Sequence, residues 1–208
     1  MAGAYGDTAL RTPETPPTLI ADPAPLGLAG FGFTTLLFGL VKSGILGSGA
    51  PGVSEGVLAL ALTFGGLAQL LAGMWAFKRG NTFAATAFTA YGAFWFSFFL
   101  LVNVFIPQML AGKATGTDVS TFVATYELAW AIFTAYMFIA SLAGARAVQA
   151  VFILLTITFA VLAIADYATS TSIGKVGGWL ALATAAAAIY ASFADVTNAN
   201  FKRRVLPT

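Results

Sequence analysis

The sequence predicts an all-α integral membrane protein with six transmembrane helices per protomer. Of its 208 residues, 59% are hydrophobic and only 9% are charged, whereas a soluble domain carries about 25% charged residues. Six apolar stretches are each close to the roughly 20 residues that a helix needs to cross a bilayer core. They lack the two-residue alternation of lipid-facing strands, which favours a helical bundle over a barrel.

The chain divides into a tail, a membrane domain and a second tail. Residues 1–22 alternate prolines with polar residues and hold no apolar run, so we predict a flexible N-terminal tail without a secretory signal. Residues 23–197 are the predicted six-helix transmembrane domain, and residues 198–208 a basic cytoplasmic tail. The expected spans are about 26–46, 57–77, 83–106, 122–143, 148–165 and 178–195.

The basic residues predict the orientation of the bundle. An even number of spans places both termini on one side of the membrane. Lys and Arg in short loops favour the cytoplasm, and the loops on the side of the termini are the richer in them. These are Lys78, Arg79, Arg146, Lys202, Arg203 and Arg204, against Lys42, Lys113 and Lys175 on the other side. We therefore expect cytoplasmic termini in a multi-pass protein of the cell membrane, plasma or inner.

Several function classes are disfavoured by what the sequence lacks. It has no Cys and no His, so disulfides, thiolate nucleophiles, zinc–sulfur sites and the commonest general base are absent. No nucleophile–base pair and no phosphate-binding glycine loop is visible. We therefore expect that the protein is not an enzyme and binds no cofactor or metal. We also expect no nucleic-acid partner, because the basic residues flank helix ends as membrane topology requires.

Polar side chains in the middle of the spans have two readings. Tyr91 and Gln69 lie deep in the third and second stretches, where an unpaired polar group costs several kcal/mol in order of magnitude. Each either joins helices or lines a wet lumen. Thr34 and Thr35 of the first stretch pose the same question, because a threonine hydroxyl can also bond its own helix.

Acids and small residues add two weaker indications. Glu127, Asp166 and Asp195 lie near predicted helix ends, so we expect solvated ends rather than a proton relay. The sixth stretch is rich in Gly and Ala from Gly177 to Ala191, which predicts close helix–helix approach. That approach suits either an oligomer or one tight bundle.

A motif at the start of the first helix carries a family resemblance. Two prolines fix backbone torsions there, and the motif reads Asp22-Pro23-Ala24-Pro25-Leu26-Gly27-Leu28. It resembles the signature of the acetate uptake transporter family, the succinate–acetate permeases. Further segments match the family in order, namely Gly65-Gly66 to Gly73, Gly80-Asn81-Thr82 to Trp95, Gly144-Ala145-Arg146 with Gln149, Ala188-Ile189-Tyr190 and Val205-Leu206-Pro207.

The resemblance implies a function and a pathway. It implies a homohexamer in which each six-helix protomer, embedded in the lipid bilayer, carries acetate and related small carboxylates, in some members succinate. By motif position, Phe31, Tyr91 and Leu155 form a hydrophobic constriction. The substrate's polar contacts fall near the signature motif and on Gln69, with Thr34 and Thr35 as further lining.

Two positions depart from the family pattern. Asp22 replaces the signature Asn and puts a negative charge at the mouth of an anion pathway, where it repels acetate unless paired or protonated. Ala76 stands where the family usually carries an acid. Both changes bear on proton coupling, so proton-coupled uptake is only slightly favoured over a passive anion channel. A non-transporting membrane sensor or scaffold is a third, weaker alternative.

Overall fold

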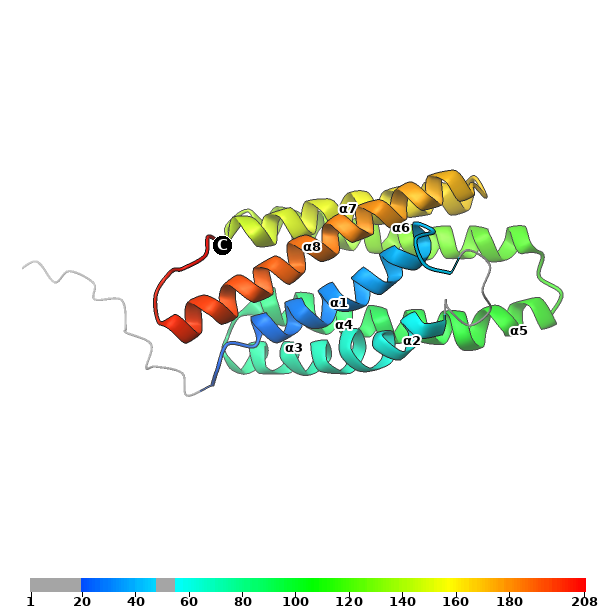
Figure 1. Ribbon diagram of the computed structural model, residues 1–208. Helices are drawn as coiled ribbons and strands as arrows, with labels where there is room; N and C mark the ends of the chain where they lie inside the picture. Colours follow the sequence, from blue (N-terminus) through cyan, green and yellow to red (C-terminus); the bar gives the residue numbers. More distant parts are fainter. Residues whose placement is uncertain (1–19, 48–54) are drawn as a thin grey trace, which may run out of the picture.

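Figure 1 shows a long bundle of antiparallel helices in the computed structural model, which describes residues 20–47 and 55–208. Six helical segments are long and apolar enough to cross a membrane, so the chain is a multi-pass membrane protein. The elements are α1 (Ala24–Lys42), α2 (Glu55–Leu62), η1 (Thr63–Ala68), α3 (Gln69–Lys78), α4 (Thr82–Leu100), η2 (Leu101–Phe105), α5 (Ile106–Ala111), α6 (Gly116–Ser141), α7 (Arg146–Tyr167) and α8 (Thr171–Phe201).

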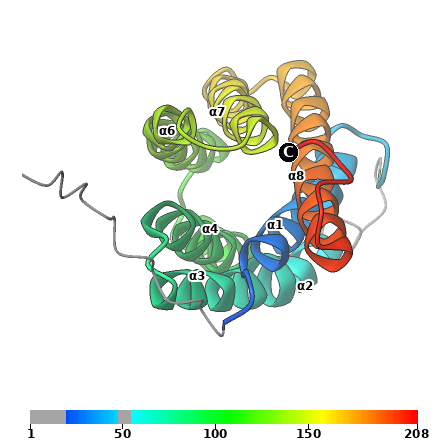
Figure 2. The same ribbon diagram turned by 90° about the vertical axis from the view of Figure 1, so that its left-hand side faces the viewer.

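Seen end-on in Figure 2, the spans form a ring in the order α1, α2 with α3, α4, α6, α7 and α8. Neighbouring helices pack closely around most of this ring, most extensively α1 on α8, α6 on α7, α7 on α8 and α3 on α4. The backbones of α4 and α6 approach each other least. Aromatic side chains, among them Phe94, Tyr126 and Trp130, fill the space between these two helices.

Small residues hold α1 against α8. A side chain at Gly32 would collide with Ile189, and one at Gly39 with Leu182. Gly178 faces the backbone of Lys42 and Ser43, leaving no room for a methyl group. The alanines that α8 buries, among them Ala181, Ala185 and Ala188, are fully enclosed. The small residues of this helix thus allow α8 to pack closely against α1 within one protomer.

Pro107 does not end the third span, contrary to the sequence prediction. The span continues to Ala111, because a π-helical turn, η2, precedes the proline. A proline has no N–H and crowds the preceding turn, and the wider turn accommodates it. A second π-helical turn, η1, lies at Gly65 and Gly66 in the second span.

Two other predicted boundaries were also wrong. Helix α6 begins at Gly116 rather than near 122, because Thr115 and Asp118 form a reciprocal capping box. Helix α8 begins at Thr171 rather than near 178, with the Ser170 side chain as its cap. Loops predicted from residue type therefore proved to be first helical turns.

The C-terminal segment folds back onto α8. Helix α8 runs to Phe201, beyond the predicted domain end at 197, and Lys202 ends it with a positive φ of 53°. The Asn198 side chain then accepts from the Val205 and Leu206 amides at 2.6 and 2.9 Å. The Tyr190 hydroxyl donates to the Pro207 carbonyl at 2.8 Å. Of the predicted N-terminal tail, residues 1–19 lie outside the described residues.

Candidate functional site

A cavity lies inside the half of the bundle far from the termini, and we call it the distal cavity. Its volume is about 70 Å³, enough for several water molecules. Its walls are mostly aromatic and aliphatic, with three hydroxyl groups and one carboxyl among them. It is lined by Phe31, Thr35, Phe38, Phe94, Trp95, Phe98, Leu101, Val102, Ile106, Val123, Tyr126, Glu127, Leu155, Thr158, Phe159, Leu162 and Ala181.

A second cavity lies in the half nearer the termini, and we call it the terminal-side cavity. Its volume is about 310 Å³. It includes an amide, a hydroxyl and a carboxyl from three different elements. It is lined by Ala24, Leu28, Asn81, Phe83, Ala84, Ala87, Phe88, Ala140, Ser141, Ala143, Gly144, Ala145, Val148, Phe152 and Asp195.

Residues of α1, α4, α6, α7 and α8 line both cavities, and three buried side chains, which we call the barrier, lie between them along the chain. On α1, Phe31 follows Leu28 of the terminal-side cavity and marks the start of the distal one. On α4, Tyr91 lies between the residues that line the two cavities, and on α7 Leu155 follows Phe152. Phe31, Tyr91 and Leu155 are 4%, 3% and 4% exposed and belong to one apolar cluster. The barrier is closed in this conformation.

Aromatic rings from three helices surround Tyr91. Its ring centroid lies 5.6 Å from that of Phe31, 6.0 Å from Trp130, 5.5 Å from Phe133 and 6.0 Å from Phe152. Of these, only Phe31 was among the predicted site residues. Mid-span aromatics are common in lipid-facing positions, so residue type alone could not single out the others.

The Tyr91 hydroxyl has a specific partner. It lies 2.9 Å from Oγ1 of Thr134, and Thr134 donates its own hydrogen to the Trp130 carbonyl at 2.6 Å. A hydroxyl has a single hydrogen, so Tyr91 donates to Thr134. This bond satisfies the phenol without water and fixes the ring across the bundle.

The two predicted threonines face different surroundings. Thr35 lines the distal cavity, whereas Thr34 does not line either cavity and lies against Gly65. Both hydroxyls donate within α1, to the carbonyls of Gly30 and Phe31 at 2.8 and 2.7 Å. Neither hydrogen is free for a carboxylate unless the side chain rotates.

Gln69 also lies away from the two cavities. It is 1% exposed and does not line either of them. Its Cβ lies where α3 passes close to Gly30 of α1, and its Oε1 has no hydrogen-bond partner among the described residues. Its part in the pathway stays a prediction.

The signature motif shapes the terminal-side cavity rather than the barrier. Ala24 and Leu28 line that cavity. A Cβ at Gly27 would lie about 2.5 Å from the Phe88 ring, so only glycine permits this contact. The Pro25 carbonyl accepts from the Ser192 hydroxyl of α8 at 2.7 Å, which ties the start of α1 to α8.

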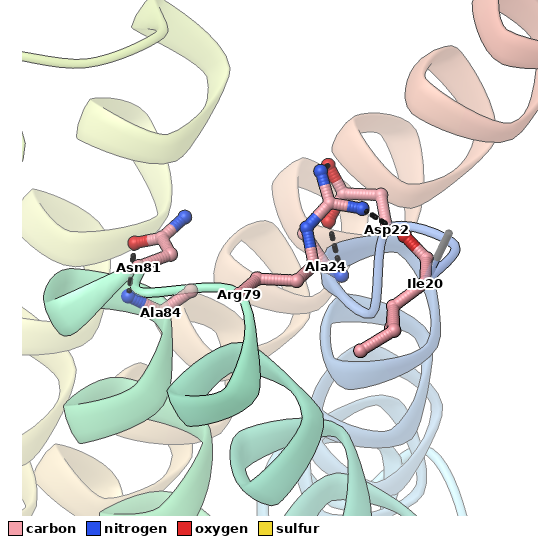
Figure 3. A network of polar contacts seen from close by, with 6 residues as sticks. All are labelled: Ile20, Asp22, Ala24, Arg79, Asn81 and Ala84. Atoms are coloured by element: carbon pink, nitrogen blue, oxygen red, sulfur yellow. Dashed lines mark hydrogen bonds and ion pairs between the residues drawn. The ribbon is translucent and has the colours of Figure 1, made fainter. Parts of the chain in front are cut away.

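Asp22, one of the two departures, is paired. Figure 3 shows its carboxylate accepting from the Ala24 amide at 2.9 Å and facing Arg79, whose Nη2 lies 3.8 Å from Oδ2. Arg79 also donates to the Ile20 carbonyl at 2.8 Å. Close by, the Asn81 side chain accepts from the Ala84 amide and caps α4, and its NH₂ group remains a donor for the terminal-side cavity.

Ala76, the other departure, lies fully buried in an apolar cluster with Leu28 and Phe88. An acid at this position would have to be housed among apolar neighbours, and the alanine instead packs against them. The terminal-side cavity nevertheless has one acidic side chain in its lining, Asp195 of α8.

Glu127 corrects the expectation that the acids are solvated helix ends. Because α6 begins at Gly116, Glu127 lies about three turns inside the helix. It is 8% exposed, lines the distal cavity, and its Oε2 has no hydrogen-bond partner among the described residues. The capping residues Thr115 and Asp118, read as a helix start, would have placed Glu127 inside the helix from the sequence.

This arrangement can hold a small solute on either side of a dry barrier. Apolar constrictions of this kind control passage by excluding water until side chains move. Within residues 20–47 and 55–208 no cluster of three metal-ligating side chains occurs.

Comparison with known proteins agrees with this arrangement. Residues 6–207 match the GPR1/FUN34/yaaH family. The chain belongs to this family. It is 41% identical over 190 residues to the succinate-acetate/proton symporter SatP of Escherichia coli K12, covering 91% of this chain and 96% of that one. It is 32% identical over 198 residues to acetate permease A of Emericella nidulans, covering 90% and 65%. The resemblance read from the signature motif is thereby confirmed.

A solved structure shares the fold. The structure of the bacterial acetate channel SatP superposes with a TM-score of 0.80 at 40% sequence identity, covering 90% of this chain and 98% of that one. The six-helix family fold predicted from the sequence is confirmed. One relative is described as a proton symporter and the solved structure as a channel, so the relatives carry both transport classes.

Proposed function

We propose that this protein transports acetate and related small carboxylates, with succinate as a further candidate, through a pathway inside each protomer. The observation that carries the proposal is the alignment of two cavities on the same helices, divided by Phe31, Tyr91 and Leu155. The descriptions of the relatives supply the substrate class. Acetate is small enough to occupy each cavity in turn.

The closed barrier defines the energetic problem of transport. A carboxylate loses its water at the aromatic contact, and a charge in an apolar, water-free segment is costly. Crossing as the neutral acid, or together with a proton, lowers that cost, which slightly favours proton-coupled uptake. A passive anion channel remains the alternative, in which movement of the barrier side chains wets the constriction.

The charge distribution supports an orientation. Lys78, Arg79, Arg146 and the Lys202–Arg204 run follow or precede helix ends at the end of the bundle where the chain ends (Figure 1). By the positive-inside rule, we place this end in the cytoplasm and the distal cavity toward the outside of a cell membrane. Large apolar side chains exposed on α3, α6 and α8 suit lipid contact and subunit contact in a homohexamer.

Uptake of labelled acetate into proteoliposomes tests the function. The assay compares an imposed inside-alkaline pH gradient with no gradient, at clamped membrane potential, and subtracts empty liposomes. Accumulation that follows the gradient indicates proton coupling. Saturating flux without accumulation indicates a channel. Absence of flux above empty liposomes contradicts the transport proposal and favours the sensor or scaffold alternative.

A further inference from the structure

The distal half of the bundle contains a charged cluster that the barrier does not use. Lys42 at the end of α1 lies 3.8 Å from Asp166 at the end of α7, Nζ to Oδ1. Both act electrostatically on Glu127 of α6. The three side chains come from three helices that form the wall of the distal cavity, and we call them the distal charged cluster.

The cluster connects the distal surface with the distal cavity. A surface hollow of about 330 Å³ is lined by Lys42, Asp166 and neighbouring hydroxyl groups, among them Ser120 and Ser170. The side chains of Lys42 and Asp166 are 32% and 23% exposed. Glu127 lies behind them, 8% exposed, on the wall of the cavity. Distal solvent therefore reaches the ion pair, and the ion pair is the route by which a proton would approach Glu127.

The charges of the cluster do not balance when every group is ionised. One lysine faces two carboxyls, so one negative charge is left without a counter-charge. The distal cavity around it is otherwise lined by aromatic and aliphatic groups and three hydroxyl side chains. An uncompensated carboxylate in such a place is costly, and binding one proton removes the charge. Tyr126, the neighbour of Glu127 on α6, is a further titratable side chain on the wall of this cavity.

An ionised Glu127 also opposes the substrate of the proposed function. A carboxylate in the distal cavity would share a small apolar space with a second negative charge, and like charges at short range repel strongly in a low-dielectric medium. A carboxylate and a protonated Glu127 are compatible. The cavity therefore admits an anion together with one proton.

We propose that Glu127 is a proton-binding residue of the transport pathway, supplied through Asp166 and Lys42, and that it must be protonated when a small carboxylate occupies the distal cavity. This inference rests on the proposed transport function. It makes Glu127 a determinant of coupling that is separate from the Phe31, Tyr91 and Leu155 barrier.

The test measures equilibrium exchange of labelled acetate in proteoliposomes with equal pH on both sides, so that the orientation of the protein does not matter. Between about pH 7 and about pH 9 acetate is almost entirely ionised, because free carboxylic acids have pKa values of about 4. The anion concentration is then constant. The wild-type exchange rate should fall as the pH rises, and the decrease should approach about tenfold per pH unit, as expected when one proton is required.

The variant Glu127→Gln keeps the shape of the side chain and removes the titration. Its exchange should stay nearly constant over the same pH range. Glu127→Asp should retain a pH dependence. Asp118→Asn, which changes an exposed acid of the same helix, is the matched control and should keep the wild-type profile. Loss of exchange in Glu127→Gln with retained pH-dependent exchange in Glu127→Asp would equally support a required carboxyl, provided both variants elute like wild type in gel filtration.

Four results would overturn the inference. A flat wild-type profile means that no proton is needed. A Glu127→Gln profile as steep as wild type means that the proton travels on the substrate itself. Loss of exchange in both variants assigns Glu127 to packing. Dependence on Na⁺, seen when choline replaces it, means that the carboxyl binds a metal cation. If wild type shows no exchange above empty liposomes, the transport function itself fails, a result distinct from these four.

Discussion

Helix α1 packs against its neighbours in two different ways on its two sides. Toward α8, Gly32, Gly39 and Gly178 bring backbones into direct contact and leave no free volume, and we call this the small-residue seam. Toward the centre of the ring, α1 and α4 meet α6 and α7 through aromatic rings centred on Tyr91 and Phe94, which we call the aromatic seam.

The contrast explains how one bundle can be both rigid and permeable. Side chains that fill the space between two helices can change rotamer while the helices stay in place. Contacts between two backbones can change only if the helices move apart. On the proposed function, the small-residue seam is the fixed wall of the pathway and the aromatic seam is its movable part. Substitutions in the first seam should affect stability alone, whereas substitutions in the second should also change flux.

Within the small-residue seam the largest effect on stability is expected from Gly178→Ala. Its new methyl group would meet the backbone of Lys42 and Ser43, and overpacking of this kind costs about 1–3 kcal/mol or more. Thermal unfolding of the detergent-solubilised protein, followed by gel filtration, measures the loss. Gly56→Ala is the control, because nothing lies within 4 Å of its Cβ position. It should be neutral or stabilise α2 by about 0.5–1 kcal/mol. Equal losses of stability in the two variants would contradict the claim that backbone contact at Gly178 holds α1 against α8.

A large effect on flux is expected from Leu155→Ala in the aromatic seam. Truncation opens the barrier, so acetate flux should rise several-fold and discrimination against bulkier carboxylates should weaken. Leu162→Ala is the matched control, since Leu162 is also buried on α7 and lines the distal cavity away from the barrier. Both variants should lose about 2–5 kcal/mol of stability, yet only the first should raise flux. A similar rise in both would place the barrier elsewhere.

A smaller effect should separate the two threonines of α1. Valine keeps the shape of threonine and removes the hydroxyl. Thr35→Val changes the wall of the distal cavity and should alter the acetate concentration at half-maximal flux. Thr34→Val should leave it unchanged, because Thr34 faces Gly65. If Thr34→Val alters this concentration and Thr35→Val does not, the substrate passes on the α2 side of α1.

The smallest effect is expected from Asp22→Asn. The carboxylate is 57% exposed and its ion pair with Arg79 is long, and exposed ion pairs contribute about 0–1 kcal/mol. The amide oxygen can still accept from Ala24. Acetate flux should therefore stay within about twofold of wild type, the factor that corresponds to roughly 0.4 kcal/mol. A much larger rise would show that Asp22 repels the substrate despite Arg79.

Sequence reasoning predicted the fold better than it predicted the polar side chains near the two cavities. Continuous apolar runs predict spans, and the signature motif led to Phe31, Tyr91 and Leu155, which the structure brings together. Helix starts were misplaced because capping residues such as Thr115 look like loop residues. That error moved Glu127 to a helix end in the prediction. The direction in which Gln69 faces depends on tertiary packing around η1, which its own sequence context does not contain.

Thiol labelling from each side tests the central claim, that two cavities form one pathway closed at Phe31, Tyr91 and Leu155. The chain has no cysteine, so single replacements need no prior removal. Val123→Cys lies in the distal cavity and Val148→Cys in the terminal-side cavity. In vesicles of known orientation, a membrane-impermeant reagent should reach the first from the distal side alone and the second from the terminal side alone. With Leu155→Ala added, each should be reached from both sides. Labelling of both cysteines from one side, or unchanged sidedness in the Leu155→Ala background, would contradict the account.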